Sequence, residues 1–403
     1  MKGTSLFLSA ILSVFFVNAQ DVLLATGNTN ISVDKNANMY VGGGISLENK
    51  STIHNDGTIL IAKNNTGKAD LIDNTSAAYN YGAGSFIFWG NGIQSVKTNA
   101  KFGTLEVDNK GLNLLSDVSS DKWNLRSGVV NTGSYYVIAA ASQTSWFAAD
   151  DDNNRFSRSW INGNLRQYIS PAKINNYILP VGDAISVRLC EMDNLTRNPL
   201  TAVQYVNVSF ARPQGGYVNA TENEMKYRAV NTAGMWAIIP DVKPTSGSYD
   251  LKLSVADFTG LWDNRFAVLN RSAADWTVPA GSSLPADGSF GRTVSGGFAQ
   301  RNNMKVFNQF AVASMDVLPA DATASYKVYP DPVTNNEFFI QVKNYQLNGF
   351  KMFAADGKEV SVSSVVRKDG QVKVNLPVIF TKGTYFVQLN TDKGLKTAKI
   401  IVQ

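Results

Sequence analysis

The chain has 403 residues, of which 44% are hydrophobic, 11% aromatic and 17% charged. This composition excludes a disordered chain, and the length exceeds what one hydrophobic core usually supports, so two or three domains are expected. The net charge of +5 is unevenly distributed. Residues 325–403 contain 11 Lys and Arg against 6 Asp and Glu, whereas residues 20–324 contain 25 against 26. The nearly neutral body is therefore not expected to bind nucleic acid.

Residues 1–19 predict a signal peptide. The apolar run from Leu6 to Val17 follows a positive start, is too short to span a bilayer, and is succeeded by small residues before Gln20. An N-terminal membrane anchor is the alternative interpretation. No later apolar run reaches the length of a membrane span, so we expect no transmembrane segment.

Residues 20–148 contain short β-type runs that are led by glycine and separated by Asn or Asp turns. They recur irregularly, at intervals of roughly twenty residues, which is the spacing of a coil in a β-solenoid. Stacking the next coil buries the apolar face that a single coil exposes. We therefore expect a β-helix or solenoid-like region, with an ordinary β-sandwich as the alternative. The clearest runs are Gly44–Leu47, Gly57–Ile61, Gly84–Phe88, Gly103–Val107 and Gly128–Val130.

Three stretches of this region, residues 89–96, 102–109 and 125–132, share turn-flanked β-type runs. They resemble the adhesin-like β-helical repeats of large surface proteins in Bacteroidetes. The resemblance implies an extended β surface and a role in adhesion.

Residues 149–314 are expected to form a central antiparallel β-sandwich. Alternating runs are separated here by Gly, Pro, Asn and Asp, and the alternation is strict in Tyr249–Val255, which predicts one buried and one solvated face. The part from about Arg155 to Ser314 resembles a sandwich module that often precedes the sorting domain of Bacteroidetes surface proteins. Residues 315–325 are rich in small residues and proline and predict an exposed linker.

Residues 326–403 predict a small all-β, Ig-like sandwich, because five short β-type runs alternate with turn residues. The segment resembles the type A C-terminal sorting domain of the type IX secretion system, with Asp331 where that family usually has Asn. The matching residues are Tyr329, Pro330, Pro332, Gly357, Gly383, Tyr385 and Lys399.

The resemblance implies that residues 326–403 engage the type IX secretion machinery, and that the signal peptide directs the first membrane crossing. It further implies cleavage in the linker, followed by attachment to cell-surface lipopolysaccharide or release. The expected location is therefore extracellular, or on the outer-membrane surface of the cell.

The residues that could perform catalysis are few. His54 is the single histidine and Cys190 the single cysteine, and neither lies in a recognisable nucleophile context, so no catalytic residue is assigned. Carboxylate pairs, with Asp117 and Asp121 among the candidates, remain open because β-helices host glycan-active enzymes. The run Asp150, Asp151 and Asp152 predicts a solvated interdomain loop, with calcium binding as the alternative. We expect no other metal and no cofactor.

Seven tryptophans can serve either as core residues or as flat platforms for sugar rings. Trp89 and Trp262 lie in loop-like contexts and are the candidates for glycan stacking. The sequence thus favours a secreted, non-enzymatic, adhesin-like protein that binds a glycan or a protein. The alternatives are an exported polysaccharide-active enzyme or carbohydrate-binding protein on a β-helix, and a structural component of the envelope.

Overall fold

The computed structural model describes residues 22–63, 69–75, 78–147, 156–170, 176–195, 199–212, 218, 220–222, 225–272, 275–285, 294, 297–317, 325–343, 347–366, 371–377, 380–391 and 394–403. All the regular elements in these ranges are β-strands, which confirms the predicted all-β class. None of the described elements is a helix that could cross a membrane. The predicted signal peptide lies outside the described residues.

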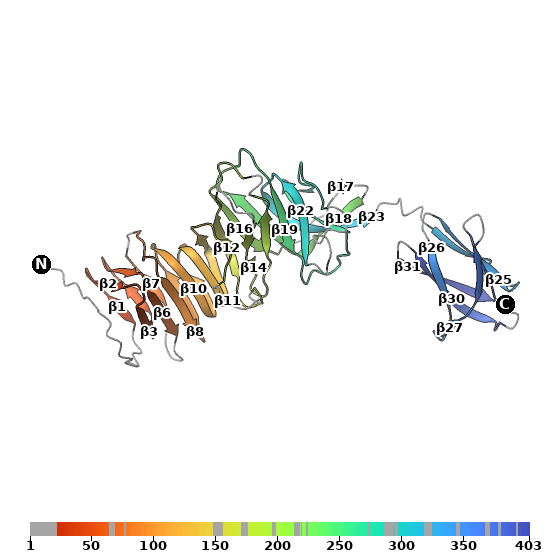
Figure 1. Ribbon diagram of the computed structural model, residues 1–403, viewed down its shortest axis with the longest axis horizontal. Coiled ribbons are helices and arrows are strands. Elements are labelled where there is room, and N and C mark those ends of the chain that lie inside the picture. Colours follow the sequence, from red (N-terminus) through yellow and green to blue (C-terminus); the bar gives the residue numbers. More distant parts are fainter. Residues whose placement is uncertain are drawn as a thin grey trace. The chain divides into compact units, whose positions relative to one another are not determined.

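The chain forms two compact units, of which the larger comprises Met1–Glu222 with Tyr227–Met315 and the smaller comprises Asn223–Lys226 with Asp316–Gln403. The larger unit begins with parallel ladders of short strands, drawn in red and orange in Figure 1. One ladder contains β1 (Leu23–Ala25), β4 (Ile45–Leu47), β7 (Leu71–Asp73) and β9 (Ile93–Lys97). A second contains β3 (Asn38–Val41), β6 (Thr58–Lys63) and β8 (Ser85–Gly90). A third pairs β2 (Asn30–Val33) with β5 (Thr52–Asn55).

The first two ladders meet in β10 (Lys101–Leu114) and continue into β11 (Val118–Ala139). The first half of β10 pairs with β8, and its second half pairs with β9. Paired residues in the second ladder lie 18 to 27 positions apart along the chain. This spacing agrees with the irregular twenty-residue recurrence of the glycine-led runs.

A column of apolar side chains explains why such short strands are stable together. Ile59, Phe86, Leu105 and Trp123 occupy equivalent positions in successive strands, and each is fully buried. Side chains alternate between the two faces of a strand, so each strand contributes its inward residues to this column. Burial of each large apolar side chain stabilises the fold by roughly 1.5–3 kcal/mol.

The strand direction changes at β12 (Ile161–Tyr168), which pairs parallel with β11 and antiparallel with β16 (Tyr205–Ala211). A separate four-stranded antiparallel sheet faces the same apolar core, which contains residues from Ala25 to Val312. That sheet contains β13 (Asn176–Leu179), β15 (Cys190–Asp193), β19 (Tyr249–Ser254) and β22 (Phe298–Met304). The main sheet continues through β14 (Val181–Gly182), β17 (Thr221–Glu222), β18 (Met225–Pro240), β20 (Phe266–Ser272), β21 (Asp275–Thr277) and β23 (Asn308–Val317).

The expected alternation is visible in β19, where Tyr249, Leu251 and Leu253 are buried and Asp250 and Lys252 are not. The linker predicted over residues 315–325 begins inside β23, and its residues 318–324 lie outside the described part of the chain.

The smaller unit has its own apolar core, to which two four-stranded sheets contribute. The first sheet has the order β24 (Ser325–Tyr329), β25 (Glu337–Lys343), β29 (Val372–Asn375) and β28 (Ser363–Val366). The second has the order β27 (Glu359–Val360), β26 (Leu347–Ala354), β30 (Gly383–Thr391) and β31 (Gly394–Val402). The neighbouring strands of each sheet run antiparallel.

Candidate functional site

The candidate site lies where β10 turns from the ladder of β8 to the ladder of β9. Asn109 and Lys110 form this corner, and together they stand opposite the single residue Gly128 of β11. Arg126 creates a second irregularity, because it is an extra residue between two paired positions of β11. Such bulges bend a strand and re-aim its side chains, and they are common beside binding sites.

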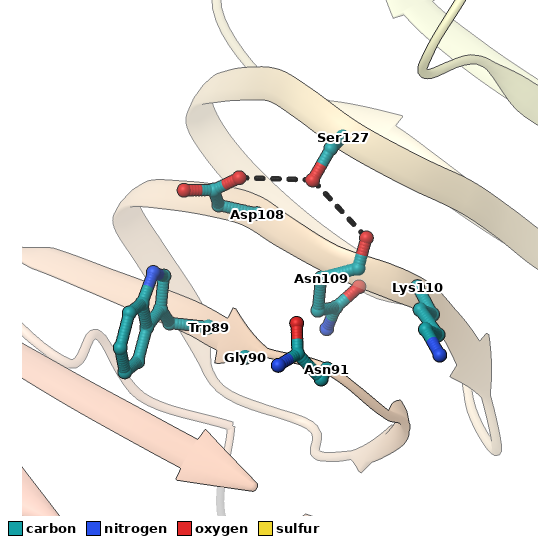
Figure 2. A pocket seen from close by; sticks show the side chains of 7 residues that line it. All are labelled: Trp89, Gly90, Asn91, Asp108, Asn109, Lys110 and Ser127. Carbon is teal, nitrogen blue, oxygen red and sulfur yellow. Dashed lines mark hydrogen bonds between the residues drawn. The ribbon is translucent and has the colours of Figure 1, made fainter.

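The corner leaves a hollow of about 410 Å³, which we call the Trp89 hollow. Figure 2 shows the indole of Trp89 at one side and the Lys110 side chain at the other, with polar side chains between them. Seven residues line it: Trp89, Gly90, Asn91, Asp108, Asn109, Lys110 and Ser127.

Three of these residues occupy one row across the ladder. Trp89 pairs in register with Asp108, and Asp108 pairs with Ser127, so 19 residues separate each from the next along the chain. The candidate Trp89 was identified from the sequence, whereas Asp108 and Ser127 were not. The equal spacing is the signal that could have identified them, since a repeat of this length places equivalent positions side by side.

Hydrogen bonds hold the floor and one wall of the hollow in place. The Ser127 hydroxyl donates to Asp108 Oδ1 at 2.9 Å, as Figure 2 shows. The buried amide of Asn109 donates to Gln94 Oε1 at 2.7 Å and accepts from the backbone N–H of Gly111 at 2.8 Å. These groups therefore need little reorganisation to meet a ligand.

A partly buried ion pair flanks this row. Arg126 Nε donates to Glu106 Oε1 at 2.6 Å, and Asn124 Nδ2 donates to Glu106 Oε2 at 3.2 Å. Both oxygens of Glu106 are thus engaged by the protein. Asp108 is the carboxylate that lines the hollow itself.

The second stacking candidate, Trp262, is 71% exposed and does not line the Trp89 hollow. The other five tryptophans are buried, which fits the use of large aromatics as core residues. They are Trp123, Trp146, Trp160, Trp236 and Trp276.

The remaining polar candidates serve local contacts. His54 Nε2 lies 3.0 Å from Asp56 Oδ2 at the surface, and the pKa of Asp56 is lowered by the backbone N–H of Ala83 and by His54. Asp121 pairs with Lys101 at 2.8 Å. Asp117 Oδ1 accepts from the backbone N–H of Tyr136 at 3.0 Å.

Cys190 is fully buried, and this burial raises the pKa of its thiol. Within the described ranges, no group of three or more His, Cys, Asp or Glu residues could hold a metal ion. The calcium candidates Asp150, Asp151 and Asp152 lie outside the described residues.

The predicted sorting-motif residues occupy turns and strands of the smaller unit. Tyr329 ends β24 and precedes Pro330 and Pro332. The centroids of the Tyr329 and Phe339 rings lie 5.7 Å apart. Gly357 adopts a positive φ of 84° in the turn between β26 and β27, a conformation that favours glycine.

The other three motif residues belong to the neighbouring strands β30 and β31. Gly383 begins β30, and the buried Tyr385 donates its hydroxyl proton to the Thr381 carbonyl at 2.7 Å. Lys399 is exposed on β31, opposite Phe386.

The segment that contains the two prolines covers the outer edge of β31. Asp331 Oδ1 accepts from the N–H of Ile401 at 2.8 Å, the N–H of Val333 donates to the Ile401 carbonyl at 2.7 Å, and the N–H of Gln403 donates to the Val333 carbonyl at 3.0 Å. An open strand edge invites pairing with another chain, so this contact protects the sheet.

Replacing Asp331 by Ala should make the Ile401 amide exchange with solvent roughly fivefold faster, because one hydrogen bond contributes about 1 kcal/mol. Hydrogen exchange followed by NMR measures this rate. Asp331→Asn is the matched control, since its amide oxygen still accepts and the rate should stay near that of the wild type. An unchanged rate in Asp331→Ala would contradict the assigned contact.

A comparison with known protein families covers the segment that contains these residues. Residues 327–403 match the family described as the secretion system C-terminal sorting domain. Residues 327–403 of the smaller unit are thus similar to a C-terminal sorting domain. This similarity supports export of the chain as cargo of the type IX secretion system, and it implies contact with that machinery.

The larger unit is not identified by these comparisons. No curated protein matches the chain. The crystal structure of neural ectodermal development factor IMP-L2 is similar at 8% identity, over 59% of this chain and 93% of that chain, with a TM-score of 0.14. That score is too low to support an argument about the larger unit.

Proposed function

We propose that the chain is a non-enzymatic, adhesin-like protein that is exported to the cell surface of a Bacteroidetes-type bacterium and binds a surface ligand through its larger unit. The single observation behind the export step is the sorting domain at residues 327–403. The signal peptide of residues 1–19 would start the route. Cleavage between the two units would leave the body on surface lipopolysaccharide or release it.

The proposed body is a β-helical stalk followed by an antiparallel sandwich. The parallel ladders and the 18- to 27-residue steps between their paired residues support the stalk. The four-stranded antiparallel sheet β13-β15-β19-β22, which shares one apolar core with the antiparallel part of the main sheet, supports the sandwich. Stacked coils present a long, rigid face, which suits adhesion.

Binding is favoured over catalysis by the residues that line the Trp89 hollow. Glycosidases use two carboxyl groups that flank the scissile bond. Asp108 is the carboxylate of the described lining, and the neighbouring Glu106 has both oxygens occupied by Arg126 and Asn124. A polysaccharide-active enzyme on the same scaffold is the alternative function.

Deletion of residues 326–403 should abolish surface display in a host that has a type IX secretion system, because the sorting domain would be missing. Protease accessibility of intact cells and immunoblots of periplasm and medium locate the product. The full chain with Trp262→Ala is the control, which keeps the sorting domain and should be displayed. Surface display of the deleted chain would refute the assigned route.

A further inference from the structure

Packing in the apolar core does not account for the position of the Trp89 side chain. In β8 the side chains of Phe86 and Phe88 enter the core, whereas Trp89 faces solvent and is 47% exposed. Its neighbours in the ladder are the small Ala62 and the short Asp108, so the indole stands above the sheet surface. Ligand sites are concave and often lined by aromatic side chains, so an exposed indole beside a hollow indicates a contact site.

Polar groups in the same hollow are available to a ligand. Asp108 uses Oδ1 to accept from Ser127, and its Oδ2 has no partner among the described residues. Among the residues that the structure describes, no partner forms a hydrogen bond or an ion pair with Lys110 Nζ or with the Asn91 side chain. The hollow thus combines a flat apolar surface with one free acceptor, one cationic donor and one amide.

We infer that the Trp89 hollow binds a neutral pyranose unit of an oligosaccharide. The axial C–H groups of one ring face would lie on the indole, whereas adjacent hydroxyls would donate to Asp108 Oδ2 and accept from Lys110 Nζ. This combination of apolar face and hydroxyl rim is typical of sugars, and the volume of about 410 Å³ falls within the range of small-molecule sites. The inference rests on the proposed surface-binding function and names its ligand class.

Charge distinguishes neutral sugars from acidic ones. Asp108 and Lys110 contribute opposite charges to the hollow, and Glu106 and Arg126 beside it form their own pair. Residues 20–324 are also nearly neutral, with 25 Lys and Arg against 26 Asp and Glu. No excess of positive charge therefore favours a polyuronate or a nucleic acid, both of which need one.

The test titrates the purified full chain with cellohexaose, xylohexaose and mannohexaose, and with trigalacturonate as the charged comparison. Tryptophan fluorescence and calorimetry follow binding. At least one neutral oligosaccharide should bind and change the emission, and Trp89→Ala should weaken this binding at least tenfold, as expected for a tryptophan at the centre of a contact. Trp89→Phe should retain part of the affinity, and Asp108→Ala should also weaken it.

Trp262→Ala is the matched control, because it removes the other exposed indole and should leave the affinity unchanged. Undiminished binding in Trp89→Ala, binding of trigalacturonate alone, or no binding of any probe would overturn the inference. Release of shortened oligosaccharides would show turnover and would overturn the proposed non-enzymatic function instead. If the hollow binds no sugar, surface display remains intact. Failure of this inference can therefore be distinguished from failure of the proposed function.

Discussion

Replacing Glu222 by Gln should lower the free energy of unfolding of the larger unit by about 3–5 kcal/mol, because it leaves the Arg301 guanidinium buried without its counter-charge. The Arg301 side chain is 0% exposed, and that of Glu222 is 14% exposed. Arg301 Nη1 and Nη2 donate to the two Glu222 oxygens at 2.9 and 2.8 Å. Such a bidentate contact is the strongest geometry for an Arg–carboxylate pair.

The surrounding groups complete the network. Arg301 Nε donates to the Val268 carbonyl at 2.8 Å, and Nη2 donates to the Tyr227 hydroxyl at 3.1 Å. Burial raises the pKa of Tyr227, so the neutral phenol can donate in turn to Glu222. Removing the carboxylate charge therefore affects several contacts at once.

Urea unfolding followed by tryptophan fluorescence measures the effect in the full chain, because all seven tryptophans precede residue 277 and report on the larger unit alone. Asp121→Asn is the matched control. It removes the same charge from the pair with Lys101, whose side chains are 36% and 45% exposed, and should cost less than about 1 kcal/mol. Equal losses in the two variants would show that the buried pair contributes no more than a surface pair.

The double variant Arg301→Met with Glu222→Met gives a second measure of the network. It removes both charges and should recover part of the stability that Glu222→Gln loses, since no uncompensated charge remains in the interior. A loss larger than that of Glu222→Gln would contradict this account.

Local pattern was enough to predict the strands and their class. Gly57–Ile61 and Gly84–Phe88 place β-branched or aromatic residues after a glycine, and they contribute to β6 and β8. The sorting domain was predicted from turn residues such as Gly357, and the family match covers residues 327–403. In both cases the information lies within a few tens of residues.

Contacts between distant residues were not predictable in the same way. Arg301 and Glu222 are 79 residues apart, and charged side chains are normally expected at the surface. Likewise, β12 joins a parallel ladder to an antiparallel strand whose paired residues lie 37 to 45 positions further along the chain, a change that no local pattern marks. Trp89 was identified as a candidate, but the polar half of its hollow depends on how three strands align.

Replacing Gly128 by Ala should destabilise the larger unit by about 2–4 kcal/mol and should abolish ligand binding at the Trp89 hollow. Gly128 has a φ of 88°, and a Cβ added there would lie 2.5 Å from the Asn109 carbonyl oxygen and 2.6 Å from the Gly111 nitrogen. Both are backbone atoms of the corner in β10, so they cannot give way as a flexible side chain would. The corner itself has to move.

Gly133→Ala separates this close approach from backbone strain. Gly133 lies in the same strand, β11, and has a positive φ of 58°, but a Cβ there meets no atom within 4 Å. It should cost only the conformational term, about 1 kcal/mol, and leave binding intact. Urea unfolding and the oligosaccharide titration measure both variants. If Gly128→Ala bound as well as Gly133→Ala, the position of Asn109 and Lys110 at the corner would not determine the site, and recognition would depend on the indole alone.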